Sequence, residues 1–588
     1  MKQDIHCFAL AVAQAGAFIH CHLSLSEYPE LYRRERDNLL QNKEIQGQDP
    51  YKLAVYSTWR LSYEKLDGPA RSFLQACSLL HHEGISEKMF EKAALSPLQL
   101  EDSELQDEVT HLLKQLGKHD SGWSSWTFRK VIMHLGSYSL IEYDHQNRTY
   151  GIHLLVHHWS GTTIEENGHD MQKLVLAIIA LSFSLTQTDE DLKYRRKLLK
   201  HTTKSLASLE PEDIDPLVGM HIAQIYSEAG RFKEAEALIV MTMEKRKRAL
   251  GNDHLDTLTS MENLANTYWY QARWSDAEAL CLVVLEKRKS LLGDEHLGTL
   301  KGMENLANTY ANLGRLNEAK ALMVAAVKKM KRVLGDDHPD TLNAMSSLAC
   351  LYLRQGHWND AEALEVVVME KRKRLLGDEH PQTLANMGNL AYTYRSQGRL
   401  DDAEAFGLVV TEKRKRLLRD EHPDTLLAMG NLAYTYREQD RLEDAEALEV
   451  VVIEKRKRGL GDEHPRTLQA MSHLALTYWK QGRWNDAKVL QVVTLEKLKQ
   501  VLGDDHPHTL EHIAHLADTY RDLGCSKDAE ALGVEVIEKM KRVLGDDHPH
   551  TLKSMSNLVT TYVALGRLKD AETLKVVVEE TRKRRDNS

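Results

Sequence analysis

The amino-acid sequence predicts an all-α fold, in which a long solenoid of helical hairpins follows a small helix-rich domain. Three observations support this expectation. A short motif recurs every 42 residues through most of the chain, the apolar residues between its copies have helical spacing, and the period is missing from the first two hundred residues. Near-identical units that repeat without insertions stack so that each unit contacts its neighbours.

The recurring motif reads Gly-Asp-Asp-His-Pro-x-Thr-Leu where it begins at Gly335, Gly503 and Gly545. Close variants begin at five other positions, which are Gly251, Gly293, Gly377, Arg419 and Gly461. The motif histidines are each 42 residues after the previous one, and they are His254, His296, His338, His380, His422, His464, His506 and His548. Asp or His followed by proline is typical of a turn that leads into a helix.

Two helices are expected in each unit. In one copy the first helix has an apolar stripe at i, i+3, i+4 and i+7, formed by Met303, Leu306, Ala307 and Tyr310. Gly314 ends that helix. The second helix of the next unit ends in the basic run 370–374, which places positive charge at the negative end of the helix dipole. Gly377 then supplies a left-handed cap, and Pro381 begins the following helix.

These units resemble the tetratricopeptide repeat, whose usual period is about 34 residues. The longer period, with Asn-Leu-Ala in the first helix and Leu-Gly-Asp-x-His-Pro between units, resembles the kinesin light chain subtype. The resemblance implies a right-handed α-solenoid of nine hairpins over residues 214–585. The first hairpin is a degenerate copy that begins around Ile222.

The N-terminal part is expected to contain helices and one short β-hairpin. The helices fit residues 5–24, 26–43, 56–63, 69–81, 85–95, 101–117 and 125–137, and the hairpin fits residues 140–150. Several helices followed by a hairpin predict a winged-helix-like domain over residues 50–168. Residues 1–45 precede this domain, and residues 169–213 are predicted to be a helical linker.

Three segments of this part resemble NB-ARC nucleotide-binding switch proteins of the NLR-like class. Residues 8–19 resemble the Gly-Leu-Pro-Leu-Ala helix, so residues 1–45 are interpreted as remnant helices of that family's helical subdomain. Residues 59–62 and 150–154 resemble its winged-helix part. The resemblance implies a nucleotide-sensing role for His153, but Ala9 and Leu154 depart from the motifs, and the phosphate-binding loop is missing. A structural role for His153 is therefore expected.

Composition and motifs exclude several classes of function. The net charge of -10 argues against nucleic acid as a partner. The apolar run 8–19 is too short to span a bilayer, so neither secretion nor a membrane partner is expected, and a cytoplasmic location is predicted. Neighbouring motif histidines would be a helix-packing distance apart, too far to share a metal ion. We expect no cofactor, no metal and no catalytic group, and therefore no enzyme.

Two sets of polar residues are interpreted as surface features. The basic runs at 245–248, 287–289, 371–374, 413–416 and 455–458 are expected to be solvated helix ends, because they recur at one place in the unit. The pairs His81-His82 and His157-His158 are expected to lie at the surface as isolated pairs.

The concave groove is the candidate binding site. In tetratricopeptide arrays the first helix of each hairpin lines this groove, and in kinesin-light-chain-type repeats an asparagine there holds a peptide backbone. The matching positions are Asn263, Asn305, Asn389, Asn431 and Asn557, whereas Ser347, His473 and His515 depart from asparagine. Nearby positions add Tyr392, Arg395, Tyr434 and Arg437. These groups suit an extended, acidic or carboxylate-bearing peptide, and the alternative is a ladder of asparagines that only joins neighbouring hairpins.

The sequence therefore favours a non-enzymatic scaffold or sensor arm of an NLR-like signalling protein, which binds a protein or peptide. A cargo adaptor of the kinesin light chain kind is one alternative, although the chain has no long heptad coiled coil before the repeats. A fragment of a nucleotide-dependent ADP/ATP switch that has lost its phosphate-binding core is the other.

Overall fold

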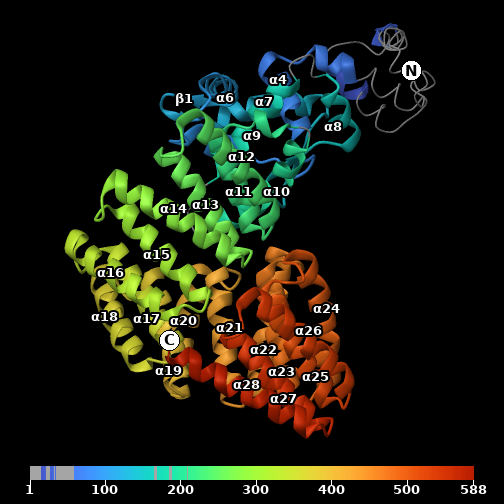
Figure 1. The fold of residues 1–588 in the computed structure, drawn as a ribbon. Helices are drawn as coiled ribbons and strands as arrows, with labels where there is room; N and C mark the ends of the chain where they lie inside the picture. The colour runs from blue at the N-terminus through green and yellow to red at the C-terminus, as the bar shows by residue number, and fades with distance from the viewer. Residues whose placement is uncertain are drawn as a thin grey trace. The chain divides into compact units, whose positions relative to one another are not determined.

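The computed structural model describes residues 15–20, 27–28, 30–31, 34, 59–163, 168–183, 189–207 and 209–587. Within the chain there are two compact units (Figure 1). The first contains residues 1–226 and 237–249, and the second contains residues 227–236 and 250–588. Most of the two helices predicted over residues 5–24 and 26–43 lies outside the described residues.

In the first unit, residues 59–64 are helical, as part of the helix predicted over 56–63, and four further predicted helices follow. These are α4 (Gly68–Leu79), α5 (Glu87–Leu95), α6 (Ser103–Leu116) and α7 (Ser125–Ser137). Further elements are β1 (Lys118–His119), β2 (Gly122–Trp123), β3 (Glu142–Asp144), β4 (Thr149–Gly151), α8 (Leu154–Gly161), α9 (Gly168–Ser182), α10 (Asp189–Leu206) and the 3-10 helix η1 (Pro211–Asp213). The sequence-based helix boundaries are confirmed to within about two residues.

The predicted β-hairpin is present as β3 and β4. The strands are antiparallel, with Glu142 opposite Gly151 and Asp144 opposite Thr149. The Asp144 carboxylate accepts hydrogen bonds from the turn, first of all from the side-chain amide of Asn147 at 2.7 Å and also from the backbone N–H of Gln146 at 2.9 Å, and these bonds lower its pKa. A second, very short hairpin formed by β1 and β2 was not predicted from the sequence.

Aromatic rings form the core of the first unit. The Phe128 ring lies 5.4 Å from Phe73 and 5.9 Å from Phe90, with the distances measured between ring centroids, and all three side chains are buried. A second pair, Trp59 and Trp159, has a centroid distance of 5.7 Å. The core therefore joins α4, α5 and α7, which are separate in sequence.

The histidines at 81, 82 and 157 form a cluster with His201, contrary to the prediction of isolated surface pairs. His81 and His82 stack with centroids 4.6 Å apart, and the His82 ring lies 6.1 Å from His157. The Nδ1 atom of His201 accepts the backbone N–H of His81 at 3.2 Å. Burial lowers the pKa of His201 to about 4, so this histidine is neutral and structural at pH 7. His158 is exposed, as predicted.

Eighteen described helices, α11 to α28, follow one another as nine successive hairpins, and from α13 onward each helix packs on the next (Figure 1). They are α11 (Pro216–Glu228), α12 (Phe232–Leu250), α13 (Leu255–Tyr270), α14 (Trp274–Leu292), α15 (Leu297–Asn312), α16 (Leu316–Leu334), α17 (Pro339–Arg354), α18 (Trp358–Leu376), α19 (Pro381–Ser396), α20 (Leu400–Leu418), α21 (Pro423–Glu438), α22 (Leu442–Leu460), α23 (Pro465–Lys480), α24 (Trp484–Val501), α25 (Pro507–Asp522), α26 (Ser526–Leu544), α27 (Pro549–Ala564) and α28 (Leu568–Asn587). We call these nine hairpins the array.

The motif between hairpins acts as a helix cap at each of its eight positions. The motif histidine is the N-cap residue in every copy, and its Nδ1 accepts a backbone N–H two residues later, for example from Asp340 to His338 at 3.2 Å. Gly377 has a φ of +90°, a conformation that L side chains rarely adopt. The predicted turn role of these residues is confirmed.

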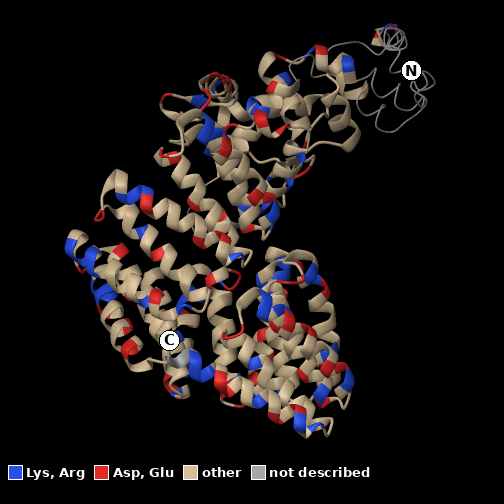
Figure 2. Cartoon of the chain, viewed as in Figure 1, with Lys and Arg blue, Asp and Glu red and all other residues tan. Residues whose placement is uncertain are grey.

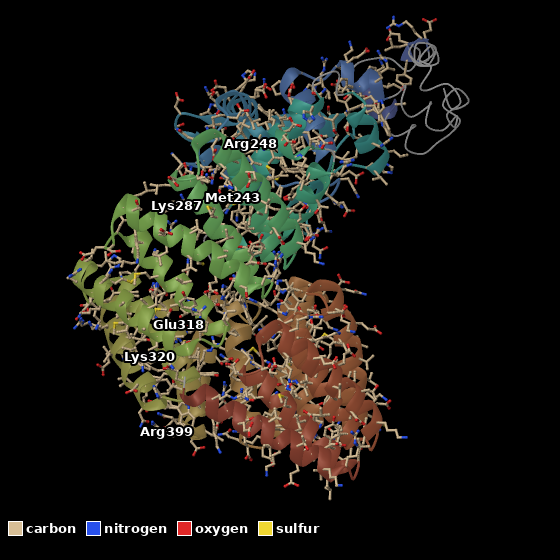
Figure 3. The ribbon with its side chains drawn as sticks, viewed as in Figure 1. Met243, Arg248, Lys287, Glu318, Lys320 and Arg399 are labelled. Atoms are coloured by element: carbon tan, nitrogen blue, oxygen red, sulfur yellow. The ribbon has the colours of Figure 1, made fainter. Side chains whose placement is uncertain are left out.

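Charged side chains join each hairpin to the next. Arg399 at the start of α20 lies 2.9 Å from Glu362 of the preceding hairpin, and its guanidinium lies 4.1 Å from the centroid of the Tyr394 ring. Lys287, Glu318 and Arg399 lie at successive places along the array (Figure 3). Both signs of charge are interspersed along the helices (Figure 2).

One arginine in several of the basic runs is buried, which corrects the expectation that these runs are wholly solvated. Arg414 is 6% exposed and donates to the backbone carbonyl of Asp424 at 2.8 Å, ten residues further on. The equivalent arginines are Arg288, Arg372 and Arg456, and each donates to a carbonyl in the first turn of the next hairpin. The neighbouring Arg374 is exposed and pairs with Asp337. The runs therefore contain one inter-hairpin contact beside solvated charges.

Candidate functional site

The predicted asparagines lie on the first helices of the array, where several of them join neighbouring hairpins. The Asn305 amide donates to Glu262 of the preceding hairpin at 2.8 Å, and the Asn557 amide donates to Asp518 at 2.7 Å. Ser347, which departs from asparagine, keeps the same contact by donating to Glu304 at 2.8 Å. Asn305, Ser347 and Asn557 thus form a ladder between hairpins. Each of them already donates a side-chain hydrogen bond to an acidic residue of the chain.

The remaining asparagines differ from one another. Burial raises the pKa of Glu365 to about 8, and the charge of Arg372 and a hydrogen bond from Asn389 oppose this rise. The Asn389 side chain therefore lies beside Glu365, whose carboxylate also accepts a hydrogen bond from the Asn386 amide. The side chains of Asn263 and Asn431 make no hydrogen bond with a described residue, and Asn431 is exposed, so these two amides are free for a ligand.

The four other predicted groove residues form one continuous stack. The Arg395 guanidinium lies 4.6 Å from the ring centroid of Tyr392 and 4.0 Å from that of Tyr434. The Arg437 guanidinium lies 4.5 Å from the Tyr434 centroid. Tyrosine and arginine therefore alternate across α19 and α21, and each ring face stabilises a neighbouring cation.

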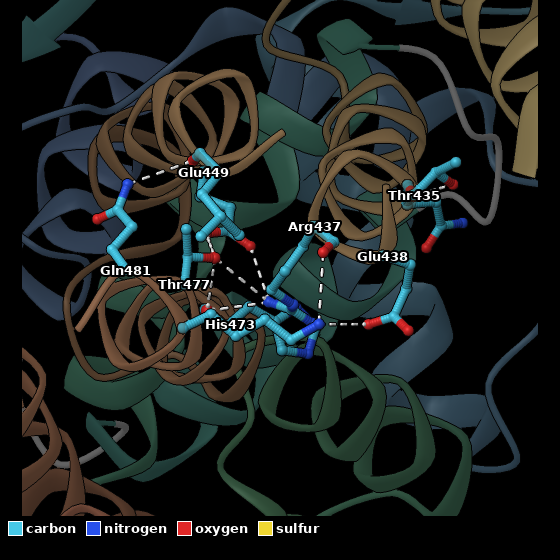
Figure 4. Close-up of polar contacts among 10 residues, drawn as sticks. Thr435, Arg437, Glu438, Glu449, His473, Thr477 and Gln481 are labelled. Carbon is cyan, nitrogen blue, oxygen red and sulfur yellow. Dashed lines mark hydrogen bonds and ion pairs between the residues drawn. The ribbon is translucent and has the colours of Figure 1, made fainter. Parts of the chain in front are cut away.

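Arg437 does not supply a free charge to the groove, contrary to its predicted role. It is 3% exposed and lies 3.1 Å from Glu449 of α22, whose other oxygen accepts from Thr477 at 2.6 Å (Figure 4). Arg437 also donates to the His473 carbonyl at 3.1 Å. Glu449 is as buried as its partner, so this arginine neutralises an acid inside the array.

Arg395 is the arginine that remains available. Arg395, Arg437 and Arg521 occupy the same position of three repeats, 15 residues after the motif histidine. Arg521 lies 2.7 Å from Asp518 and 3.0 Å from Asp522, whereas Arg395 makes no ion pair with any described residue. Burial lowers the pKa of Arg395, and the nearby Tyr434 and Tyr392 oppose this effect. The result is a partly desolvated cation whose donors can meet a carboxylate.

A group of histidines on the last two hairpins was not included in the predicted site. Glu511 lies 3.9 Å from His508 and 4.0 Å from His550, and it also interacts with His515. Burial lowers the pKa of His515 to about 4, although Glu511 opposes this effect. These histidines stand at positions that vary between repeats. The sequence marked His515 as a departure from asparagine, but it gave no sign that His508 and His550 lie near the same glutamate.

His153 has a structural role within the first unit. It is the N-cap residue of α8, and its Nδ1 accepts the backbone N–H of Leu155 at 3.3 Å. Its side chain is exposed. Among the described residues, no group of His, Cys, Asp or Glu could hold a metal ion. Within the described ranges, every helix is too short or too polar to cross a membrane.

Two profiles, both described as the tetratricopeptide repeat, match this chain. One matches residues 217–290, 298–366 and 509–575, and the other matches residues 383–424, 425–466 and 467–508. Together they cover more than half of the chain. This is a tetratricopeptide-repeat protein. The residues that form the site, from Tyr392 to Arg437, all lie within the second set of matched repeats.

Several solved structures resemble parts of this tetratricopeptide-repeat protein. A putative kinesin light chain with nearly identical repeats, from Podospora anserina, is 27% identical and covers 34% of this chain and 95% of its own, with a TM-score of 0.31. A signal transduction ATPase with a tetratricopeptide repeat sensor, from Pyrococcus horikoshii, is 12% identical and covers 87% of this chain and 74% of its own, with a TM-score of 0.36.

A Rap protein in complex with competence and sporulation factor is also similar. It is 12% identical and covers 62% of this chain and 99% of its own, with a TM-score of 0.37. No curated protein matches the chain. The repeat profiles therefore identify the family, and these TM-scores add no argument about function.

Proposed function

We propose that this tetratricopeptide-repeat protein is a non-enzymatic scaffold that binds an extended, acidic peptide on the first helices of the array. The observation that carries the proposal is Arg395, which lies between two tyrosine rings with no ion pair to a described residue. A partly buried guanidinium without a carboxylate partner is costly to keep, and an acidic ligand would offset that cost.

The neighbouring residues define what such a ligand would meet. Tyr392 is 49% exposed and offers a ring face, and Asn431 offers a free amide to a peptide backbone. Arg437, Asn389, Asn305 and Asn557 are held by acidic residues of the chain, so we assign them to the scaffold. The proposed site is therefore Tyr392, Arg395, Asn431 and Tyr434.

We further propose that the array is the sensing arm of an NLR-like signalling protein. The supporting features are the order of the NB-ARC-like segments ahead of the array, and the helices α4 to α7 and the β3–β4 hairpin that lie between residues 59–62 and the end of the segment at 150–154. Ligand binding to the array would then be the input of the switch. In this proposal His153 keeps its structural role as the N-cap residue of α8 in the first unit.

The test is a selection of peptides from a random library with the whole chain, followed by affinity measurements on the selected peptides. Acidic peptides should be enriched. A hydrogen bond to a charged group contributes about 1.5–3 kcal/mol, so Arg395→Ala should weaken binding by roughly ten- to a hundredfold. It should also flatten the salt dependence of the affinity, because one charge pair is lost.

Arg521→Ala is the matched control. It removes the same side chain from the same repeat position, but this arginine is paired with Asp518 and Asp522. We expect the Arg521→Ala variant to bind the selected peptides with the affinity of the wild type. An equal loss in both variants, or a selection without acidic enrichment, would contradict the proposed site.

A further inference from the structure

The motif histidines share one local role, but some of them make a second contact far along the chain. In each motif loop Nδ1 accepts a backbone N–H, so in the neutral ring the proton is on Nε2. The Nε2–H of His464 donates to the carbonyl of Glu228 at 3.1 Å, and that of His506 donates to the carbonyl of Tyr270 at 3.4 Å. Both contacts join residues 236 positions apart, or about 5.6 repeats.

Glycines at the ends of the first helices lie against the same loops. A Cβ atom on Gly230 would be 2.6 Å from Cδ of Pro465, and one on Gly314 would be 3.5 Å from Cδ2 of His548. At the same repeat position, a Cβ on Gly356 or Gly398 would meet open space. The close approach is therefore specific to the hairpins that meet the last three motif loops.

Aromatic rings pack around these contacts on both sides. His506 is 8% exposed, and its ring stacks on His508 with centroids 5.4 Å apart. On the other side, the Tyr270 ring stacks in parallel on Phe232, with centroids 5.4 Å apart. His338, in a motif loop without such a contact, keeps a side chain that is 36% exposed.

We propose that these contacts hold one superhelical turn of the array against the next. We call them the inter-turn contact, and it consists of His464, Pro465, His506 and His548 on one side and Glu228, Gly230, Tyr270 and Gly314 on the other. Because the inter-turn contact joins hairpins six units apart, it closes one superhelical turn around the first helices of the hairpins. The proposal depends on the array alone and is independent of the ligand.

An electrostatic effect inside the second unit supports this arrangement. Burial lowers the pKa of His550 on α27, and among the smaller effects the charge of Arg354 on α17 lowers it further. These residues are nearly two hundred positions apart, so the first helices of distant hairpins approach one another.

Two variants of motif histidines test the contact, with hydrogen exchange as the measurement. Aspartate is among the best N-cap residues, so His506→Asp and His338→Asp both keep a capped helix. Only His506→Asp removes the donor to Tyr270 and places a carboxylate beside its carbonyl. We expect severalfold faster amide exchange over residues 266–274 in His506→Asp, and wild-type exchange there in His338→Asp.

Exchange over residues 266–274 that matches the wild type in His506→Asp would overturn the proposal, because only a direct contact transmits the change over 236 positions. Faster exchange spread evenly along the whole array would also count against it. A peptide-binding defect of Arg395→Ala has no bearing on this result, so the two proposals fail separately.

A second pair of variants tests the shape of the array. Gly230 and Gly398 have φ values of +77° and +79°, so an alanine introduces similar backbone strain at both positions. Only at Gly230 does the new Cβ meet Pro465. Small-angle X-ray scattering should show a larger radius of gyration for Gly230→Ala than for Gly398→Ala, at equal helical content by circular dichroism. Equal radii for the two variants would contradict an inter-turn contact.

Discussion

The first unit and the array build their cores in two different ways. In the first unit the Phe128 ring contacts Phe73, Phe90, Trp123 and Tyr150, which come from four separate elements. In the array, Leu390 is fully buried among residues of its own and the adjacent hairpins, such as Val366 and Tyr394. The first core depends on contacts that occur once, and the second depends on a contact that recurs in every repeat.

This difference in how the cores are built explains which positions of the array can form a binding site. Because the same core positions recur, each hairpin is stabilised mainly by its neighbours. Positions outside the recurring set can then differ between repeats at little cost. Arg395 and Arg521 occupy equivalent positions, yet only Arg521 has an ion-pair partner among the described residues. The candidate binding site lies at positions where the repeats differ from one another.

The strongest test of the comparison is Phe128→Ala. Loss of a buried phenylalanine costs about 3–5 kcal/mol, and in a core without repetition the loss should affect the first unit as a whole. Hydrogen exchange should become faster throughout α4 to α9. Trp126→Ala on the same helix is the control, since Trp126 is 64% exposed and should leave the exchange unchanged. A change confined to α7 would contradict a single cooperative unit.

A somewhat smaller and more local effect is expected for Leu390→Ala. The lost core leucine should cost about 2–5 kcal/mol, but protection should fall mainly within residues 342–468, because each hairpin contacts only its neighbours. Exchange in the first unit should remain at its wild-type rate. The control is Leu427→Ala on α21, since Leu427 is 49% exposed. Uniform loss of protection over the whole chain would refute the modular behaviour of the array.

The smallest effect distinguishes the two kinds of asparagine. Asn305→Ala removes the hydrogen bond to Glu262 and should lower the free energy of unfolding by about 1 kcal/mol. Asn431→Ala removes an amide without such a bond and should leave this free energy unchanged. Urea denaturation of both variants measures the difference. If the two variants are equally destabilised, the inter-hairpin ladder does not depend on the Asn305 amide.

The sequence predicted most of the array, because the same residues mark the same boundary in every repeat. The motif histidines at 254 and 548 are both N-cap residues, so the role predicted for one motif loop applies to every copy. The helices of the first unit were also predicted well, since their apolar spacing and capping residues are local signals.

The roles of single residues were harder to predict, because they depend on partners outside the repeat pattern. Arg395 and Arg437 are equivalent by sequence, but Glu449 stands where other repeats have Cys281, Met323 or Gly407, and this acid decides the role of Arg437. The histidine cluster of the first unit joins residues more than a hundred positions apart. No period or local motif signals such contacts.

The inter-turn contact also makes the array sensitive to the number of its hairpins. The loop that begins the seventh hairpin, at His464, meets the end of the first helix of the first hairpin. The loop of the eighth hairpin bonds to the second in the same way, and the His548 ring in the loop of the ninth lies against Gly314 of the third. Six hairpins would thus contain no such contact, and every hairpin beyond the sixth adds one. The gain or loss of whole repeats would therefore change the stiffness of the array in discrete steps. The interface between adjacent hairpins would stay the same.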